Sequence, residues 1–132
     1  MLKVEDAHFS ISGTSILDGV SFEIIEGEIA CLLGPSGSGK TSILRLIAGL
    51  ESLDSGKIFI GDQLVSNKQR NLPPNKRGIG FLFQDYALFP HLTVHQNIAW
   101  GIRKTEKDKS RVIVKQLLDR IQMYDQAQKY PH

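Results

Sequence analysis

The stretch "EIACLLGPSGSGKTSILRLIAGL", Glu28 to Leu50, decides the fold. It begins with five consecutive apolar residues, Ile29–Leu33, which predict a strand covered on both faces, as in a parallel sheet. A loop containing three glycines follows. Apolar residues then recur at helical spacing before a glycine that predicts the end of the helix. These are Ile43, Leu44, Ile47 and Leu50, with Gly49 as the stop. A strand, a glycine-rich loop and a helix in this order predict a parallel α/β unit.

The loop itself has the pattern G-x-x-x-x-G-K-[ST], carried by Gly34, Gly39, Lys40 and Thr41. At the start of a helix, backbone N–H groups and the helix dipole converge on an anion. Glycines let the backbone wrap phosphates, Lys40 adds a positive charge toward the β and γ phosphates, and Thr41 offers a hydroxyl to Mg²⁺. The pattern therefore predicts a P-loop that binds a nucleotide with Mg²⁺. The alternative is a turn that binds no ligand.

Composition limits the partners. The 132 residues include 16 basic and 14 acidic side chains, and a net charge of +2 argues against nucleic acid as the partner. The single cysteine, Cys31, lies inside the apolar run "IACLL", which predicts a buried thiol in a reducing compartment. No apolar run approaches the roughly 18 residues that span a bilayer, so we expect a soluble chain.

Further strands are predicted around this core. Regular alternation or apolar runs indicate them at Leu2–His8, at Val20–Ile24, around Ile58 and Ile60, and at 78–83 with the sequence "GIGFLF". The last of these reads as another buried strand.

The C-terminal third reads as helical. Thr93 and Gln96 form a capping box that predicts a short helix through Ile98 and Ile102. The run "RKTEKDK", 103–109, predicts a solvated linker, and Ser110 is a plausible N-cap for the next helix. An apolar stripe on that helix predicts a face packed into the core; it consists of Val114, Leu117, Leu118 and Ile121.

Two other groups bear on the chemistry. Gln84 follows the predicted strand 78–83, where an amide beside a phosphate site could coordinate Mg²⁺ and hold a water; the alternative is a surface glutamine that begins a turn.

His91 and His95 are four residues apart, but His91 precedes the Thr93 cap, so we do not expect a metal pair. The string "NKQR", 67–70, lacks the acid of N-K-x-D, which disfavours guanine.

Two segments resemble the ATP-binding subunits of ABC transporters, and the resemblance covers the whole chain. Glu26–Asp62 is similar to the P-loop segment of that family, and "GFLFQDYALFPHLTVHQNIAWG", 80–101, to its Q-loop and the start of its helical subdomain. The amino-acid sequence of residues 71–101 is most similar to that of ferric-iron importers, followed by sulfate, polyamine and sugar importers. The resemblance implies an α/β P-loop NTPase fold, N-terminal half only: an antiparallel β subdomain and P-loop core over 1–84, and the Q-loop with the start of the helical subdomain over 85–132.

The resemblance also implies roles for individual residues. Lys40 and Gln84 would be catalytic, and Thr41 and Gln84 would be the Mg²⁺ ligands. Ile11 stands where the family usually has an aromatic ring under adenine, and Phe9, two residues earlier, could take that place if the strand is regular. The implied phosphate cradle is Ser36, Gly37, Ser38, Gly39, Lys40, Thr41 and Ser42.

The family further implies ATP and Mg²⁺ as ligands, a homodimer in the full-length protein, and a peripheral location on the cytoplasmic face of the inner membrane. The loop Tyr86–Leu92 would meet a helix of a membrane-spanning permease subunit, unless it only packs locally. The activity implied is an ATPase that energises solute import, with ferric iron as the best guess.

Parts of the family's machinery are not identifiable in these residues. They are the Walker B aspartate, the following glutamate, the switch histidine and the "LSGGQ" signature that follows a "YPH" string in relatives. Two hypotheses stay open: the N-terminal part of a transport ATPase, or a truncated module that binds ATP without turnover. Residues 1–132 alone are expected to be inactive and poorly soluble, with an open apolar sheet edge.

Overall fold

The computed structural model describes residues 1–102 and 107–132, and of residues 107 and 108 only the backbone. The chain divides into two compact units, 1–81 and 82–132, which are described separately.

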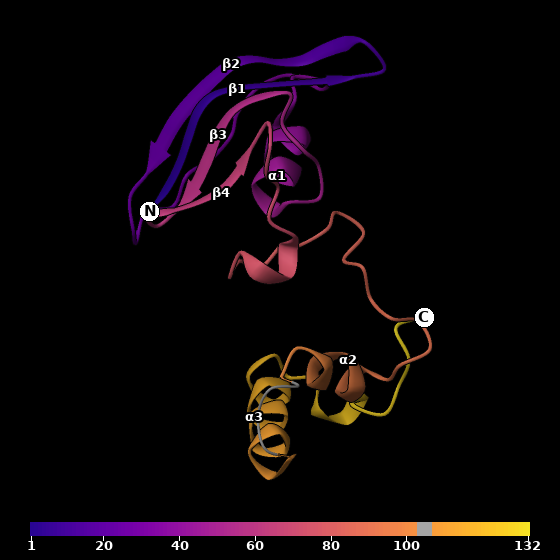
Figure 1. Ribbon diagram of the computed structural model, residues 1–132. Coiled ribbons are helices and arrows are strands. Elements are labelled where there is room, and N and C mark those ends of the chain that lie inside the picture. Colours follow the sequence, from indigo (N-terminus) through magenta and orange to yellow (C-terminus); the bar gives the residue numbers. More distant parts are fainter. Residues whose placement is uncertain (103–106) are drawn as a thin grey trace. The chain divides into compact units, whose positions relative to one another are not determined.

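The first unit is built on a four-stranded sheet in the order β2-β1-β3-β4 (Figure 1). Its strands are β1 (Leu2–Ile11), β2 (Thr14–Ile24), β3 (Ser55–Ile60) and β4 (Gln63–Asn67). Every neighbouring pair is antiparallel. The strands predicted at Leu2–His8 and Val20–Ile24 are present as β1 and β2. Both are longer than the sequence pattern indicated, since β1 continues to Ile11 and β2 begins at Thr14.

One helix, α1 (Lys40–Ala48), supplies the apolar side chains that cover this sheet. Gly49 caps its C-terminus with φ 80°, a left-handed conformation that favours glycine, so the predicted stop is confirmed. Leu44 and Leu50 of the predicted stripe are exposed. The core joins α1 to all four strands through Val4, Ala7, Phe9, Leu17, Ile43, Leu46, Leu53, Ile58 and Val65.

The two predicted buried strands are absent from the part of the chain that the structure describes. Residues 29–33 have no regular structure; Ile29 is fully exposed and Leu33 is 88% exposed. Residues 78–83 are likewise irregular, with Leu82 77% exposed. A parallel strand is stabilised only when strands on its flanks receive its hydrogen bonds, and the four described strands pair with one another instead. The predicted parallel unit and the predicted burial of Cys31, which is exposed, are therefore wrong.

The described part of the second unit contains α2 (Val94–Trp100), α3 (Lys107–Arg120) and the short 3₁₀ helix η2 (Tyr124–Gln126). The 3₁₀ helix η1 (Pro74–Lys76) belongs to the first unit. The capping box of α2 is confirmed: the Gln96 amide donates to Thr93 Oγ1 at 3.3 Å, and the Thr93 amide donates to Gln96 Oε1 at 2.8 Å.

Helix α3 differs from its prediction at its start. It begins at Lys107, so Ser110 lies inside it and is not its N-cap. Of the predicted linker 103–109, residues 103–106 lie outside the described residues and 107–109 are helical. Within the apolar stripe Val114 and Leu118 are buried, whereas Leu117 and Ile121 are exposed, because only one edge of the stripe meets the rest of the unit. None of the helices in the described ranges is long and apolar enough to cross a membrane.

Candidate phosphate-binding site

The loop before α1 closes around the ammonium group of Lys40. This group donates to the Gly34 carbonyl at 2.8 Å, to the Pro35 carbonyl at 2.6 Å and to Ser38 Oγ at 3.2 Å. The Ser38 amide donates back to the Pro35 carbonyl at 3.3 Å. The positive charge is thus held inside the loop whose backbone it contacts, which places a cation beside the N-terminus of α1.

The first turn of α1 presents backbone donors without a competing acid. Its N-cap is Gly39, which has no side chain to accept from the first amides, and the first turn contains no acidic residue. The N-terminus of a helix carries the positive end of the helix dipole. These uncapped amides together with Lys40 form an arrangement that favours an anion, and a phosphate group matches it.

Gly39 is fixed at its position by a close approach to β2. Its φ is 83°, and a Cβ added there would lie 2.8 Å from Leu17 Cδ2 and 3.1 Å from the Ile16 carbonyl oxygen. A side chain would therefore require the Leu17 side chain to move and would crowd the Ile16 carbonyl of the strand. The glycine of the sequence pattern thus serves two purposes here: it allows the left-handed turn into α1, and it lets the loop lie against β2.

Each predicted cradle residue lies in this loop or in the first turn of α1. Ser36, Gly37, Ser38 and Thr41 are exposed, and Ser42 is partly buried. Thr41, the predicted Mg²⁺ ligand, is the second residue of α1. A hydroxyl oxygen is a suitable ligand for this hard cation, so the residue type fits the role.

The predicted adenine position lies at the end of the hairpin β1–β2. Ile11 is 51% exposed and pairs with Thr14 across the turn formed by Ser12 and Gly13. Because Ile16 approaches Gly39, this end of the hairpin lies two strand residues, roughly 7 Å, beyond the contact with the loop. An exposed apolar surface at Ile11 is therefore available to a base.

Phe9 cannot replace the missing ring. It is only 6% exposed and belongs to the core of the first unit. The register shift between Phe9 and Ser10 comes from Ile16, an extra residue on β2, so the burial of Phe9 and not a break in β1 argues against its stacking on a base. The hypothesis that Phe9 stacks on adenine is wrong for this reason.

Gln84 belongs to the second unit, whereas Thr41 belongs to the first. It is exposed and lies in a turn closed by the Tyr86 amide, which donates to the Phe83 carbonyl at 3.0 Å. Its shared role with Thr41 at Mg²⁺ stays a prediction. In the described part of the chain, no group of three His, Cys, Asp or Glu side chains could hold a metal ion, His91 and His95 included.

The loop Tyr86–Leu92 is attached to α2 by a single amide side chain. Asn97 Oδ1 accepts from the Phe89 amide at 2.9 Å, and its Nδ2 donates to the Phe89 carbonyl at 3.1 Å and to the Leu92 carbonyl at 3.0 Å. The Phe89 ring also packs against Trp100, with 4.8 Å between ring centres. Tyr86 and Leu88 remain exposed, at 69% and 56%. The loop is thus held in shape while apolar side chains point to solvent.

Two groups that hold the first unit in shape were not predicted. Arg77, only 3% exposed, donates from its guanidinium to the Leu46 and Ile47 carbonyls at the end of α1, both at 2.8 Å, and to the Leu72 carbonyl at 2.7 Å. It also contacts Asn71 Oδ1. Burial lowers the pKa of Arg77. No sequence signal marks this residue, because its acceptors are backbone groups from distant segments.

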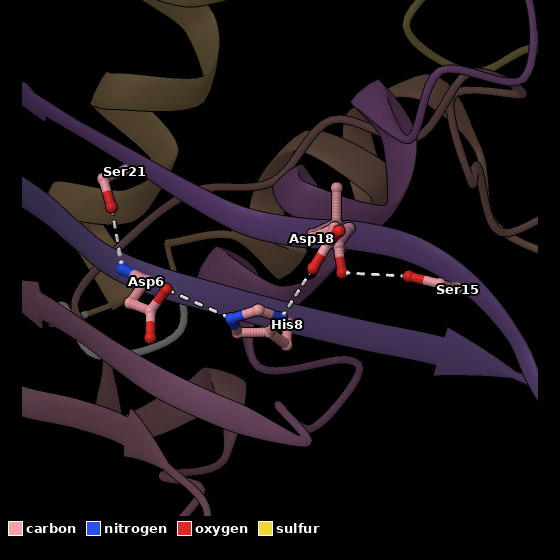
Figure 2. Close-up of polar contacts among 6 residues, drawn as sticks. Asp6, His8, Ser15, Asp18 and Ser21 are labelled. Carbon is pink, nitrogen blue, oxygen red and sulfur yellow. Dashed lines mark hydrogen bonds and ion pairs between the residues drawn. The ribbon is translucent and has the colours of Figure 1, made fainter.

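The second group joins β1 to β2 where their register is irregular. Figure 2 shows His8 between two carboxylates, with Nε2 3.1 Å from Asp6 Oδ1 and Nδ1 3.2 Å from Asp18 Oδ1. The Asp6 amide donates to Ser21 Oγ at 2.8 Å. The His8–Asp18 and Asp6–Ser21 contacts cross the hairpin that carries Ile11 and join β1 to β2, whereas the His8–Asp6 contact lies within β1.

Comparisons with known proteins identify the family and the fold of the chain. The family profile described as "ABC transporter" matches residues 17–132. A solved structure of an ATP-binding cassette, described as dimeric and in a post-hydrolysis state with ADP and Pi bound, matches with a TM-score of 0.81 and 24% identity, covering 99% of this chain and 62% of that chain. At this identity the match shows the fold alone. The predicted fold class is confirmed.

Curated relatives match at higher identity. The sulfate/thiosulfate import ATP-binding protein CysA 2 of Agrobacterium fabrum is 48% identical over 116 residues, 85% of this chain and 33% of the relative. The Fe(3+) ions import ATP-binding protein FbpC of Yersinia enterocolitica is 41% identical over 124 residues, covering 93% and 35%. The spermidine/putrescine import ATP-binding protein PotA of Thermotoga maritima is 45% identical over 118 residues, covering 88% and 31%. The chain spans about a third of the length of these relatives.

Proposed function

Because this chain belongs to the ABC transporter family, we propose that its loop 34–42 binds the phosphates of ATP, with Mg²⁺, in an import ATPase. The observation that carries the proposal is the enclosed Lys40 ammonium beside the uncapped amides of α1. Both groups donate hydrogen bonds, and both favour a negative charge.

Binding requires an exchange of partners at Lys40. A phosphate oxygen replaces the Gly34 or Pro35 carbonyl as the acceptor, and the ammonium then makes a charge-assisted bond to an anion instead of a neutral oxygen. The Thr41 hydroxyl would hold Mg²⁺, with Gln84 as the proposed second ligand, and the ion would supply charge neutralisation at the phosphates. The loop amides keep the phosphate chain oriented.

The Lys40→Ala substitution tests the site. Charge-assisted hydrogen bonds are worth roughly 1.5 to 3 kcal/mol each, so the substitution should weaken MgATP binding by about tenfold or more. Isothermal titration calorimetry on the full chain measures this, with Lys68→Ala as a matched control because Lys68 is exposed and lies outside the loop. Equal affinity of the Lys40→Ala protein and the parent would remove the assignment.

The transported solute is proposed from the relatives. Their names include import proteins for sulfate, ferric iron and polyamines. Ferric iron remains our proposal for the substrate, and a sulfate, polyamine or sugar importer is the alternative. Uptake measured in cells that lack this protein, for each solute in turn, distinguishes them; a defect confined to sulfate uptake would overturn the assignment to iron.

We also propose that the loop Tyr86–Leu92 docks on a membrane-spanning permease subunit, that the full-length protein is a homodimer, and that it works at the cytoplasmic face of the inner membrane. The exposed Tyr86 and Leu88 on an anchored loop support the docking surface. Leu88→Asp should abolish co-purification with the permease and leave MgATP affinity unchanged. Retained co-purification would contradict this role of the loop.

A second function is an ATP-binding module without turnover. We expect residues 1–132 to bind MgATP without hydrolysing it. A phosphate-release assay, run beside the calorimetry, distinguishes an ATPase from a module that only binds ATP. Mg²⁺-dependent turnover that is lost in the Lys40→Ala protein would refute this second function.

A further inference from the structure

A second basic site lies in the unit formed by residues 82–132. It is a cavity of about 270 Å³ among α2, α3 and η2. Three cationic or titratable basic side chains line it, together with an aromatic ring, a buried apolar side chain and an amide. They are His95, Arg111, Lys115, Tyr124, Leu118 and Gln128.

The fold holds these side chains around one space. Arg111 and Lys115 lie one helical turn apart on α3, so they project from the same face. The Lys115 ammonium lies 5.9 Å from the centre of the Tyr124 ring, a distance at which the cation is attracted to the ring. The His95 amide donates to the Ala127 carbonyl at 2.9 Å, which fixes the start of α2 against the opposite wall.

Among the described residues that line this cavity, none is Asp or Glu. The ion pairs found between described side chains include Lys3–Glu5, His8–Asp6 and His8–Asp18, and none of these involves Arg111 or Lys115. Asp119 lies one turn after Lys115 on α3 but does not line the cavity. Like charges at this spacing destabilise a helix, and an anion between them removes that repulsion.

We propose that this cavity binds the phosphate group of a small anion, such as inorganic phosphate or a phosphate monoester. The guanidinium of Arg111 is suited to a bidentate contact with two phosphate oxygens, and Lys115 adds a point charge. The volume of about 270 Å³ lies just below the range of about 300 to 1,000 Å³ for ligand pockets, which favours a small ligand. This site is separate from loop 34–42, which belongs to the other unit.

Nuclear magnetic resonance of the full chain, titrated with inorganic phosphate, tests the proposal. Chloride at equal ionic strength is the reference for a general salt effect. We expect saturable shifts of the His95 ring signals and of the Gln128 side-chain amide. The Gly39 backbone signal reports on the other loop in the same spectra, so binding at the two places is resolved.

Variants then identify the groups that bind. Arg111→Gln and Lys115→Gln should each weaken the phosphate response at His95 by about fivefold or more, as expected for a lost contact between partly exposed charges. Arg120→Gln is the matched control, since it removes a positive charge from α3 outside the cavity. A linear response that chloride reproduces, or equal weakening in the Arg111→Gln and Arg120→Gln proteins, would overturn the proposal. Unchanged backbone spectra establish that the variants are folded.

Discussion

Replacement of Arg77 by methionine should destabilise the first unit, because Met retains much of the apolar stem and removes all donors. Four backbone carbonyls receive bonds from this guanidinium: those of Leu46, Ile47, Val65 and Leu72. The Leu46 and Val65 carbonyls would keep another donor after the substitution. The Gly49 amide donates to the Leu46 carbonyl at 3.1 Å, and the Leu72 amide donates to the Val65 carbonyl at 2.9 Å.

The carbonyls of Ile47 and Leu72 are thus the ones that lose most. A buried acceptor left without a donor costs about 1 to 3 kcal/mol, and part of this is offset because the buried charge is also removed. We expect a net loss of roughly 2 to 4 kcal/mol in the free energy of unfolding.

Urea denaturation followed by far-ultraviolet circular dichroism measures this loss. The matched control is Lys76→Met, which removes a positive charge from the neighbouring, exposed position. If the unfolding free energies of the Arg77→Met and Lys76→Met proteins agree within about 0.5 kcal/mol, the value expected of a surface substitution, then Arg77 does not stabilise the end of α1.

Three further predictions concern the hairpin and the loop. Gly39→Ala should destabilise the chain by about 2 to 3 kcal/mol in urea denaturation, because φ is 83° and the new Cβ would lie 2.8 Å from a side-chain carbon; a loss below about 0.5 kcal/mol would show that the loop moves freely. Ile11→Tyr should favour ATP over GTP in calorimetry, since an aromatic ring stacks on a base with about 1 to 3 kcal/mol; a parent that already prefers ATP a hundredfold contradicts this reasoning. The hydrogen bond from Lys3 lowers the pKa of the Glu5 carboxyl in the folded protein. The pair therefore contributes to stability at neutral pH. This contribution is lost as the pH falls below about 4.3, the pKa of an unperturbed Glu, and through the lower pKa of the folded state. Lys3→Gln should raise the midpoint of the Glu5 titration measured by nuclear magnetic resonance, and an unmoved midpoint would mean that the ion pair is not formed in solution.

Features determined by neighbouring residues were predictable from the sequence. The left-handed cap at Gly49 and the reciprocal bonds of Thr93 and Gln96 each depend on a few consecutive residues, and both are present. The conformation of loop 34–42 is of the same kind, because glycines and a lysine at fixed spacing determine it, while its binding of phosphate stays a prediction. Its position against β2 was not predictable, since the contact of Gly39 with Leu17 joins segments 22 residues apart.

Features determined by distant partners were predicted less well. The run Ile29–Leu33 has the composition of a buried strand, but a strand also needs neighbours to receive its hydrogen bonds, and composition does not supply them. Phe9 was proposed as a substitute for Ile11 on the strand pattern alone, whereas the core that buries Phe9 is formed by distant segments and leaves Ile11 exposed. Ser110 resembles a cap, yet the three residues before it are helical as well.

The anchoring of the loop Tyr86–Leu92 by Asn97 has a mechanical consequence. The loop and the first turn of α2 are joined by three hydrogen bonds of one side chain. The amides of Val94 and His95 in that same turn donate to the Lys129 and Ala127 carbonyls, each at 2.9 Å. We therefore expect a displacement of the exposed loop to be passed through the first turn of α2 to residues 127–129.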